Sequence, residues 1–107
     1  MNTVQEKVDA LVKMLEENKA ENVIAINVGD KTIIADYFII CSGRSVPHVK
    51  ALSEYVDEKA PELGLEILRT EGYSAGRWIV MDMAYVLVHI FLPEEREYYN
   101  MERLYRD

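Results

Sequence analysis

The run from Cys41 to Ser45 ends an apolar stretch and contains residue types that phosphate-binding loops use. Gly43 allows a ligand to approach the backbone closely, and a helix beginning after Ser45 would direct free amide N–H groups at an anion. The run lacks the spacing of a P-loop or of a dinucleotide-binding motif. We therefore interpret it as a turn followed by a helix cap, and anion binding stays an alternative.

Asp36 and Asp82 raise the question of two-metal chemistry, as nucleotidyltransferases perform it. That chemistry needs paired carboxylates on one strand face. The residue two positions after Asp82 is Ala84, and Asp36 begins a different strand. Because one carboxylate of the pair is missing, the sequence predicts a protein that is not an enzyme, with no catalytic residues.

The histidines, His48 and His89, have no cysteine or carboxylate at ligand spacing, so we expect neither a metal site nor a cofactor. A Ser-His-Asp set can be assembled from Ser42, His89 and Asp82, but it lacks a nucleophile elbow. We interpret His89 as a satisfied or interfacial histidine.

Length and cysteine content indicate one domain over residues 1–107. A chain of 107 residues buries roughly two thirds of its extended-chain surface on folding, so it needs no disulfide or metal. Cys41 is single and lies in an apolar run, which predicts a small buried side chain in a reducing compartment. The first twenty residues match neither a signal peptide nor a membrane span. We therefore expect a cytoplasmic protein.

The charge balance argues against direct binding to nucleic acid. There are 19 acidic and 12 basic residues, and the formal net charge is −7. Binding to a phosphate backbone normally needs a basic stripe. A basic protein is the expected partner.

The N-terminal residues follow the pattern of an amphipathic helix, with charged side chains on the face opposite the apolar ones. Asn2 or Thr3 is placed to cap this helix, and Asn22 is expected to end it. Its apolar stripe consists of Val4, Val8, Leu11, Val12 and Leu15.

Two apolar runs, residues 23–28 and Tyr37 to Cys41, are typical of buried strands. The turn at Gly29 favours antiparallel pairing between them. Ser45 is expected to cap a second helix that Pro61 and Gly64 end. The buried stripe of that helix is predicted to be Val46, Val49, Leu52, Tyr55 and Val56.

A short third strand is expected at Leu65 to Leu68. Because the second helix is a crossover, this strand can pair in parallel with the second strand. The polar tail, residues 94–107, is rich in aromatics and is expected to form short helical turns docked on the sheet. These elements predict an α/β fold with a single mixed sheet of about five strands and packed helices.

The run from Arg77 to Phe91 is predicted to be a β-hairpin with its turn near Met83 and Ala84. With that turn, Ile79 and Met81 lie beside Val88 and Val86 on a core face. The other face carries Trp78, Val80 and Asp82 across from His89, Leu87 and Tyr85, with Phe91 beyond.

This outer face combines apolar bodies with polar tips, which suits a partly covered surface. The chain's own tail is one cover, since Tyr98, Tyr99 and Tyr105 are available. A protein partner is the other, and each aromatic anchor would then contribute about 2 kcal/mol or more if centrally buried. Both covers can apply at different edges of the face.

Six segments together resemble a known family in their order and spacing, over most of the chain. They are Ala35 to Gly43 with Ser45, Glu71-Gly72, Trp78 to Asp82, Val88 to Phe91, Arg96 to Tyr99, and Glu102 to Leu104. The family they resemble is that of the ribosomal silencing factors, also called RsfS or Iojap-like.

The resemblance implies a nucleotidyltransferase-like topology without the transferase activity. It also implies binding to the large ribosomal subunit through ribosomal protein L fourteen, a block on subunit joining when nutrients are short, and a homodimer when the protein is free. A homodimerisation module without ribosomal role, and a magnesium-dependent transferase near Ser42 and Asp82, are the rival hypotheses.

The hairpin face and the tail motif together give the expected partner-binding residues. Trp78 and Ile79 match the pair that the family links with its ribosomal contact. The full set is Trp78, Ile79, Val80, Asp82, Tyr85, Leu87, His89, Phe91, Arg96, Tyr98 and Tyr99.

The chain departs from the family at the hairpin turn. The family usually has Asp-Tyr-Gly-Asp, whereas this chain has Asp82, Met83, Ala84 and Tyr85. Alanine and tyrosine resist positive φ, so contacts near the turn are not expected to carry over. Tyr105 stands where the family commonly has tryptophan.

Overall fold

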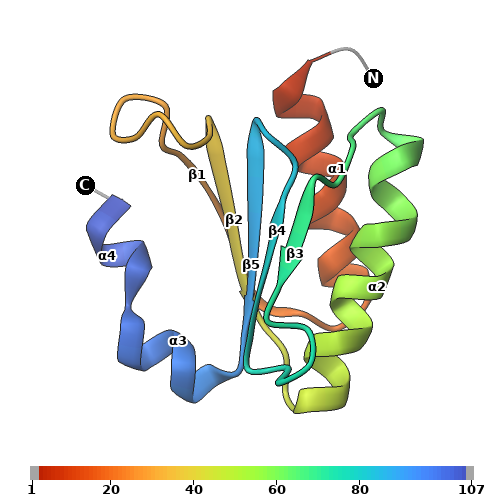
Figure 1. Cartoon of the computed structure of the whole chain (residues 1–107), viewed down its shortest axis with the longest axis vertical. Helices are drawn as coiled ribbons and strands as arrows, with labels where there is room; N and C mark the ends of the chain where they lie inside the picture. Colours follow the sequence, from red (N-terminus) through yellow and green to blue (C-terminus); the bar gives the residue numbers. More distant parts are fainter. Residues whose placement is uncertain (1–2, 106–107) are drawn as a thin grey trace.

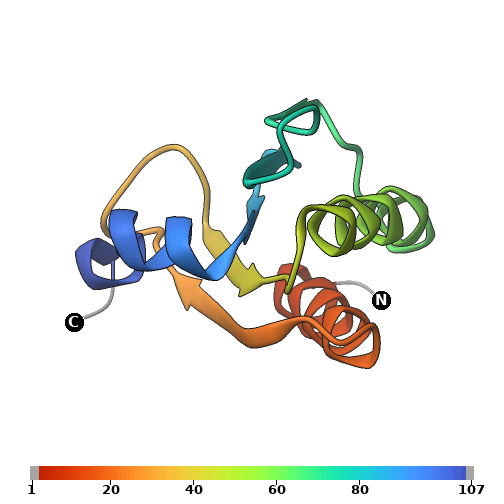
Figure 2. The ribbon, with the colours of Figure 1, turned by 90° about the horizontal axis from the view of Figure 1, so that it is seen from below.

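The computed structural model describes residues 3–105, which form one five-stranded sheet with helices on both faces (Figures 1 and 2). The helices α1 and α2 cover one face, and the C-terminal helices α3 and α4 lie over part of the other. The strands are β1 (Glu21–Asn27), β2 (Tyr37–Ser42), β3 (Arg69–Glu71), β4 (Trp78–Asp82) and β5 (Val86–Phe91), and the helices are α1 (Val4–Glu17), α2 (Val46–Glu62), α3 (Pro93–Tyr99) and α4 (Met101–Tyr105).

The strand order is β1-β2-β5-β4-β3, in which β2 and β5 pair in parallel and the other neighbouring strands pair antiparallel. The predicted mixed sheet and the antiparallel β1–β2 pair are confirmed. The predicted parallel pairing of the second and third strands is wrong, because β3 pairs with β4 at the sheet edge. Every residue of β5 is buried, whereas all three residues of β3 are exposed. This difference in burial fits β5 at the centre of the sheet, beside β2, and β3 at its edge.

Helix α1 begins at a capping box. The Thr3 hydroxyl oxygen accepts a hydrogen bond from the Glu6 N–H, and the Glu6 carboxylate accepts one from the Thr3 N–H, each at 3.1 Å. Asn2, the other candidate cap, lies outside the described residues. The helix ends at Glu17, with Asn18 as its C-cap, rather than at Asn22, because Lys19 takes a φ of 72° that a helix cannot continue.

Helix α2 begins after Ser45, as predicted, with Pro47 in its first turn. It continues through Pro61 to Glu62, and Gly64 then turns the chain with a φ of 73°. Tyr55, expected in the buried stripe, is exposed. Residues 65–68 are not a strand, since β3 begins only at Arg69.

The hairpin turn has a left-handed residue although it lacks glycine. Met83 N–H donates to the Val86 carbonyl at 2.9 Å, and Tyr85 N–H donates to the Met83 carbonyl at 2.9 Å. The second bond closes a γ-turn around Ala84, whose φ is 67°. The Asp82 carboxylate supports this turn by accepting from the Ala84 N–H at 2.9 Å.

The loop is therefore centred one residue later than predicted, and the strand register differs by two. Ile79 lies opposite Ile90, and Trp78 lies opposite Phe91. The predicted pairing was wrong, but a shift of two residues keeps every side chain on its predicted face.

We predict that Ala84→Gly raises the free energy of unfolding by about 1 kcal/mol, because glycine adopts a positive φ without the steric cost that alanine pays. Urea denaturation measures the change. Ala10→Gly in α1 is the matched control and should lower the same free energy by about 1 kcal/mol. Destabilisation by both changes would contradict the strain assigned to Ala84.

Candidate functional site

The face of the sheet turned away from α1 and α2 carries a cluster that we call the aromatic face. It is formed by side chains of β2, β4 and β5. Its members are Phe38, Trp78, Val80, Leu87, His89 and Phe91, with Asp82 at its edge. The apolar members lie on one face because successive strand residues alternate sides.

Trp78 is the centre of the aromatic contacts on this face. Its ring stacks on Phe91 at a centroid distance of 4.9 Å and meets Tyr99 of α3 at 4.6 Å. Its indole N–H donates to Nδ1 of His89 at 3.2 Å. Trp78 is half-buried, so one part of the ring is packed and another part is open.

The tail covers part of this face. Tyr105 of α4 contacts the Phe38 ring at 4.8 Å, and Met101 packs on the same cluster. The prediction that the tail forms short helices docked on the sheet is confirmed. Trp78, Val80 and Asp82 remain partly exposed. The two covers expected from the sequence are thus compatible, since the tail leaves part of the face uncovered.

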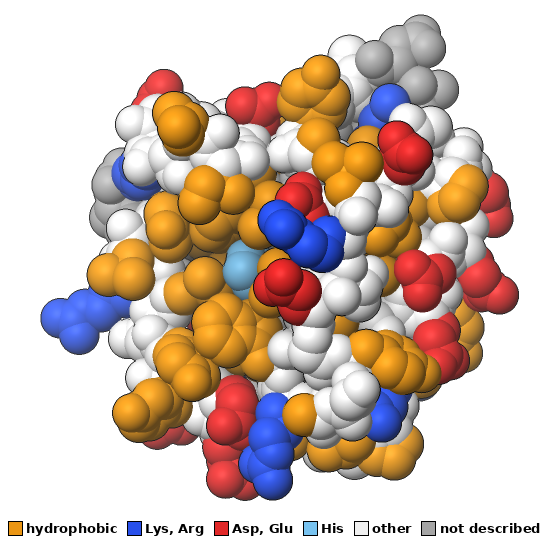
Figure 3. All heavy atoms as spheres, in the orientation of Figure 1, with side chains coloured by type: hydrophobic (Ala, Val, Ile, Leu, Met, Phe, Trp, Pro, Cys, Tyr) orange, Lys and Arg blue, Asp and Glu red, His pale blue; other side chains and the backbone are white. Residues whose placement is uncertain are grey.

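The open part of this face is predominantly apolar. Figure 3 shows apolar side chains gathered over the sheet between α4 and β3, with charged groups at the margin. At that margin Arg69 lies 3.5 Å from Asp82. On α3, the exposed Glu94 and Glu97 flank Tyr98, whose exposed fraction is 81%. The surface therefore offers aromatic rings beside acidic groups.

Some of the expected partner-binding residues are unavailable to a partner. Successive residues of β4 point to opposite faces of the sheet. Ile79 therefore lies on the face that α1 and α2 cover, where it is fully buried. Phe91 is fully buried beneath Trp78, and Leu87 is also buried. His89 forms part of the floor of the face with an exposed fraction of 4%. Tyr85, by contrast, is exposed at the hairpin turn.

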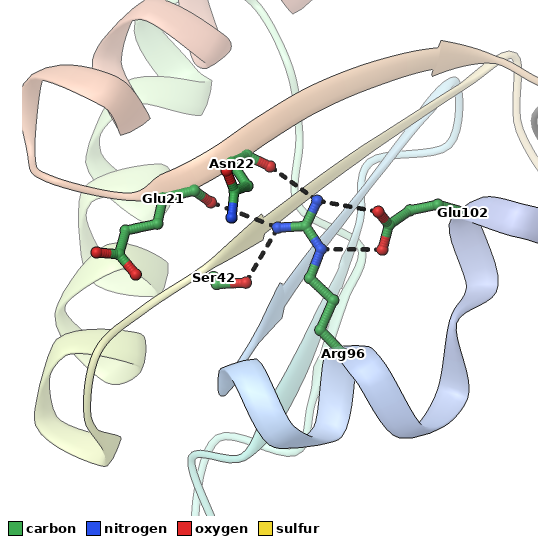
Figure 4. A network of polar contacts seen from close by, with 5 residues as sticks. All are labelled: Glu21, Asn22, Ser42, Arg96 and Glu102. Carbon is green, nitrogen blue, oxygen red and sulfur yellow. Dashed lines mark hydrogen bonds and ion pairs between the residues drawn. The ribbon is translucent and has the colours of Figure 1, made fainter.

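Arg96 was also expected to bind a partner, but its guanidinium points into the protein (Figure 4). Its Nε donates to Glu102 at 2.9 Å, Nη1 to the Ser42 hydroxyl at 3.0 Å and Nη2 to the Asn22 carbonyl at 2.8 Å. Further bonds to Glu21 O and to the second Glu102 oxygen use the remaining donors. Arg96 therefore fastens the tail to the ends of β1 and β2.

The sequence pattern gave no sign of the Arg96 network. Two of its acceptors are backbone carbonyls more than seventy positions away along the chain. In the sequence, Arg96 and Glu102 are two opposite charges six residues apart, and that spacing does not predict an ion pair. The exposed Ile33 and Ile34, in the loop after β1, were also missed as surface residues.

The polar groups of the Cys41 to Ser45 bend are used within the protein. The Arg44 N–H donates to His48 Nδ1 at 3.0 Å, and the His48 N–H donates to the Ser45 hydroxyl at 3.2 Å. Gly43 is required because a Cβ there would lie 2.8 Å from the Val49 side chain. The bend is thus a packed turn with a helix cap, as the first interpretation held.

The remaining candidate chemical groups also have structural surroundings. Cys41 is buried, and desolvation raises the pKa of its thiol to about 12. Asp82 supports the hairpin turn and pairs with Arg69. Within residues 3–105, no three His, Cys, Asp or Glu side chains gather as a metal site. No described helix is long and apolar enough to cross a membrane.

This chain is similar to a known protein family and to one of its bacterial members. Residues 1–107 match the family described as "Ribosomal silencing factor during starvation". A ribosomal silencing factor of Halalkalibacterium halodurans is 42% identical over 103 residues, covering 96% of this chain and 88% of that relative.

Two further comparisons extend this likeness to structure and to a eukaryotic protein. A crystal structure of a Chromobacterium violaceum protein superposes with a TM-score of 0.92 at 33% identity, covering 96% of this chain and 86% of that one. The mouse mitochondrial assembly of ribosomal large subunit protein 1 is 32% identical over 101 residues, covering 92% of this chain and 44% of that relative.

We predict that Arg96→Met lowers the free energy of unfolding by about 3 kcal/mol, since it leaves the partly buried Glu102 carboxylate without its partner. Arg44→Met is the matched control. It breaks an exposed pair with Glu21 and should cost less than about 1 kcal/mol. Chemical denaturation of both variants measures the difference, and equal losses would show that the network is no stronger than a surface pair.

His89 also predicts a pH dependence of stability. Desolvation lowers the pKa of its ring from 6.5 to about 4. Between these values the unfolded chain binds a proton that the folded chain does not, so stability falls as pH decreases from 6.5 to about 4, by about 3 kcal/mol in total. Below about pH 4 this contribution levels off.

The measurement is the free energy of unfolding against pH for the parent chain and for His89→Asn. Carboxylates titrate in both proteins, so the difference between the two curves isolates the histidine. Parallel curves over this range would show that His89 has the same pKa in the folded and unfolded chain.

Proposed function

The chain belongs to the family of ribosomal silencing factors, and we propose that it binds the large ribosomal subunit through ribosomal protein L fourteen and thereby blocks joining of the small subunit. Translation is repressed in this way when nutrients are limiting. The observation that carries the proposal is the half-open aromatic face around Trp78. The name of the mouse relative, which refers to assembly of the large ribosomal subunit, supports the same target.

The packing of the aromatic face suits a binding surface. The Trp78 ring is held against both Phe91 and Tyr99, so it loses little conformational freedom when a partner covers it. Aromatic side chains at the centre of an interface contribute most of the binding energy in many complexes. The surface that we propose for contact comprises Trp78, Val80, Asp82, Tyr85, Tyr98 and Tyr99, with His89 beneath.

The charge of the chain suits a basic partner. The formal net charge is −7, and the exposed Glu94 and Glu97 stand beside Tyr98 on α3. Arg96 adds no positive charge to this surface, because its guanidinium is turned inward. Complementary charge accelerates encounter, while aromatic contacts slow dissociation.

We propose that the factor acts in the cytoplasm by occupying a surface, without catalysis. Once bound, it needs only to stand where the small subunit would dock.

We also propose that the free chain forms a homodimer, for which the exposed Tyr98 and Tyr99 provide apolar area. If dimerisation were its only role, adding the chain to ribosomes would leave the proportion of joined particles in a sedimentation profile unchanged.

We predict that Trp78→Ala weakens binding to purified large subunits by about thirtyfold, corresponding to about 2 kcal/mol. Tyr98→Ala removes a side chain that is 81% exposed and should weaken binding about tenfold with little effect on folding. Sedimentation of labelled chain with large subunits measures both affinities.

Tyr55→Ala is the control for this experiment. Tyr55 is an exposed aromatic on α2, on the other side of the sheet, so its removal should change binding less than twofold. Circular dichroism establishes that each variant is folded. Equal affinity for the Trp78, Tyr98 and Tyr55 variants would remove the aromatic face from the proposed contact.

A further inference from the structure

The hydrogen bond between Trp78 and His89 determines where the protons of the histidine are. An indole N–H only donates, so Nδ1 of His89 must be the acceptor in the 3.2 Å contact. In the neutral ring the proton is then on Nε2. That nitrogen is buried and has no hydrogen-bond partner within residues 3–105.

The surroundings of His89 keep its ring neutral and fixed. His89 has an exposed fraction of 4%, and its ring packs edge-on against Phe38 at a centroid distance of 5.0 Å. The Phe91 ring is nearly parallel to it at 6.2 Å. Burial lowers the pKa of His89 to about 4, so the lone pair of Nδ1 is available near neutral pH.

The orientation of Trp78 depends on this one directional contact. Its stacking with Phe91 and its tilted contact with Tyr99 would tolerate rotation or reversal of the indole, because ring contacts are broad in geometry. A reversed indole would point its N–H away from His89. The hydrogen bond therefore selects one of the ring positions that stacking alone permits.

We propose that His89 is a positioning residue for partner binding: its Nδ1 holds the Trp78 indole in one orientation and occupies the indole N–H. The partner then meets only the apolar ring of Trp78. The matching partner group is an aliphatic side chain or the methylene stem of a lysine or arginine, rather than a hydrogen-bond acceptor. This inference rests on the proposed function, since it concerns the same surface.

A pair of amide substitutions separates the two nitrogens of His89. In His89→Asn the side-chain oxygen is bonded to Cγ, as Nδ1 is, so an acceptor for the indole remains. In His89→Gln the terminal nitrogen is as many bonds from Cβ as Nε2 is, so a donor remains there. The Gln carbonyl oxygen is one bond further from Cβ than Nδ1 is, so the acceptor at the Nδ1 position is lost. Both variants bury an amide in the same place, which makes each a control for the other.

The first measurement is hydrogen exchange of the indole N–H by NMR. Trp78 is the single tryptophan in the sequence, so one indole signal reports on the bond. We expect exchange in His89→Gln to be at least tenfold faster than in the parent chain. Exchange in His89→Asn should stay within about threefold of the parent chain.

The second measurement is affinity for purified large subunits. We expect His89→Asn to bind within about threefold of the parent chain and His89→Gln to bind about tenfold more weakly. In a Trp78→Phe background, which has no indole N–H, the Gln substitution should cause no further loss. This background keeps the test valid if the amide variants are less stable, because the loss of stability is then common to both comparisons.

Several outcomes would overturn the inference. Retention of binding by Gln and loss by Asn would show that Nε2 acts directly on the partner. Equal binding by both variants, whether strong or weak, would show that Nδ1 does not position the indole for the partner. A parent chain that does not bind large subunits would overturn the proposed function and the binding role of His89 together. The exchange experiment would still report whether the hydrogen bond exists.

Discussion

The sheet has two apolar faces, but the chain has long helices for only one of them. Strands β2 and β5 are buried on both sides, and α1 and α2 are both used to cover one side. Within residues 3–105, the other side receives α3 and α4, of seven and five residues, and α4 has no buried residue. Such short helices cannot cover a five-stranded sheet, so aromatic rings stay partly exposed beside them. The candidate binding surface is therefore the uncovered part of the second face together with the exposed tyrosines of α3 beside it.

A tail with so few buried side chains needs directional contacts to fix its position, and Arg96 provides them. Near Asn22, whose φ is 50°, the register between β1 and β2 is irregular. The carbonyls of Glu21 and Asn22 accept from the guanidinium there, together with Ser42 and Glu102. A buried ion pair is often worth little in net stability, but it specifies one arrangement because alternatives leave charges unpaired. In this protein it decides which part of the aromatic face is covered and which part is open.

The pattern of apolar residues predicted the sheet, the main helices and the two faces of the hairpin, because periodicity records which side of an element is buried. It did not predict the register, since the turn around Ala84 is held by the Asp82 side chain and lacks the glycine of the usual hairpin turns. The strand order was also not predicted. It depends on β5 being more apolar than β3, and the pattern within each strand alone does not make that comparison. Because Ile79 is next to Trp78 in the family motif, both residues were predicted to bind a partner. Their side chains point to opposite faces of the sheet, since successive strand residues alternate.

The groups that the sequence offered for chemistry are engaged in holding the fold. The bend after β2 uses its amides and its serines for the α2 cap and for Arg96, and Asp82 is bonded to the hairpin turn. Burial keeps the Cys41 thiol protonated. The indole N–H of Trp78 is likewise taken by His89.

What stays available at the surface is ring area and negative charge, and these two properties contribute in different ways. Ring area lowers the rate of dissociation, whereas charge raises the rate of encounter with a basic partner. The proposed mechanism, in which the protein acts by occupying a surface, requires both of these rates to be set and requires no reacting group.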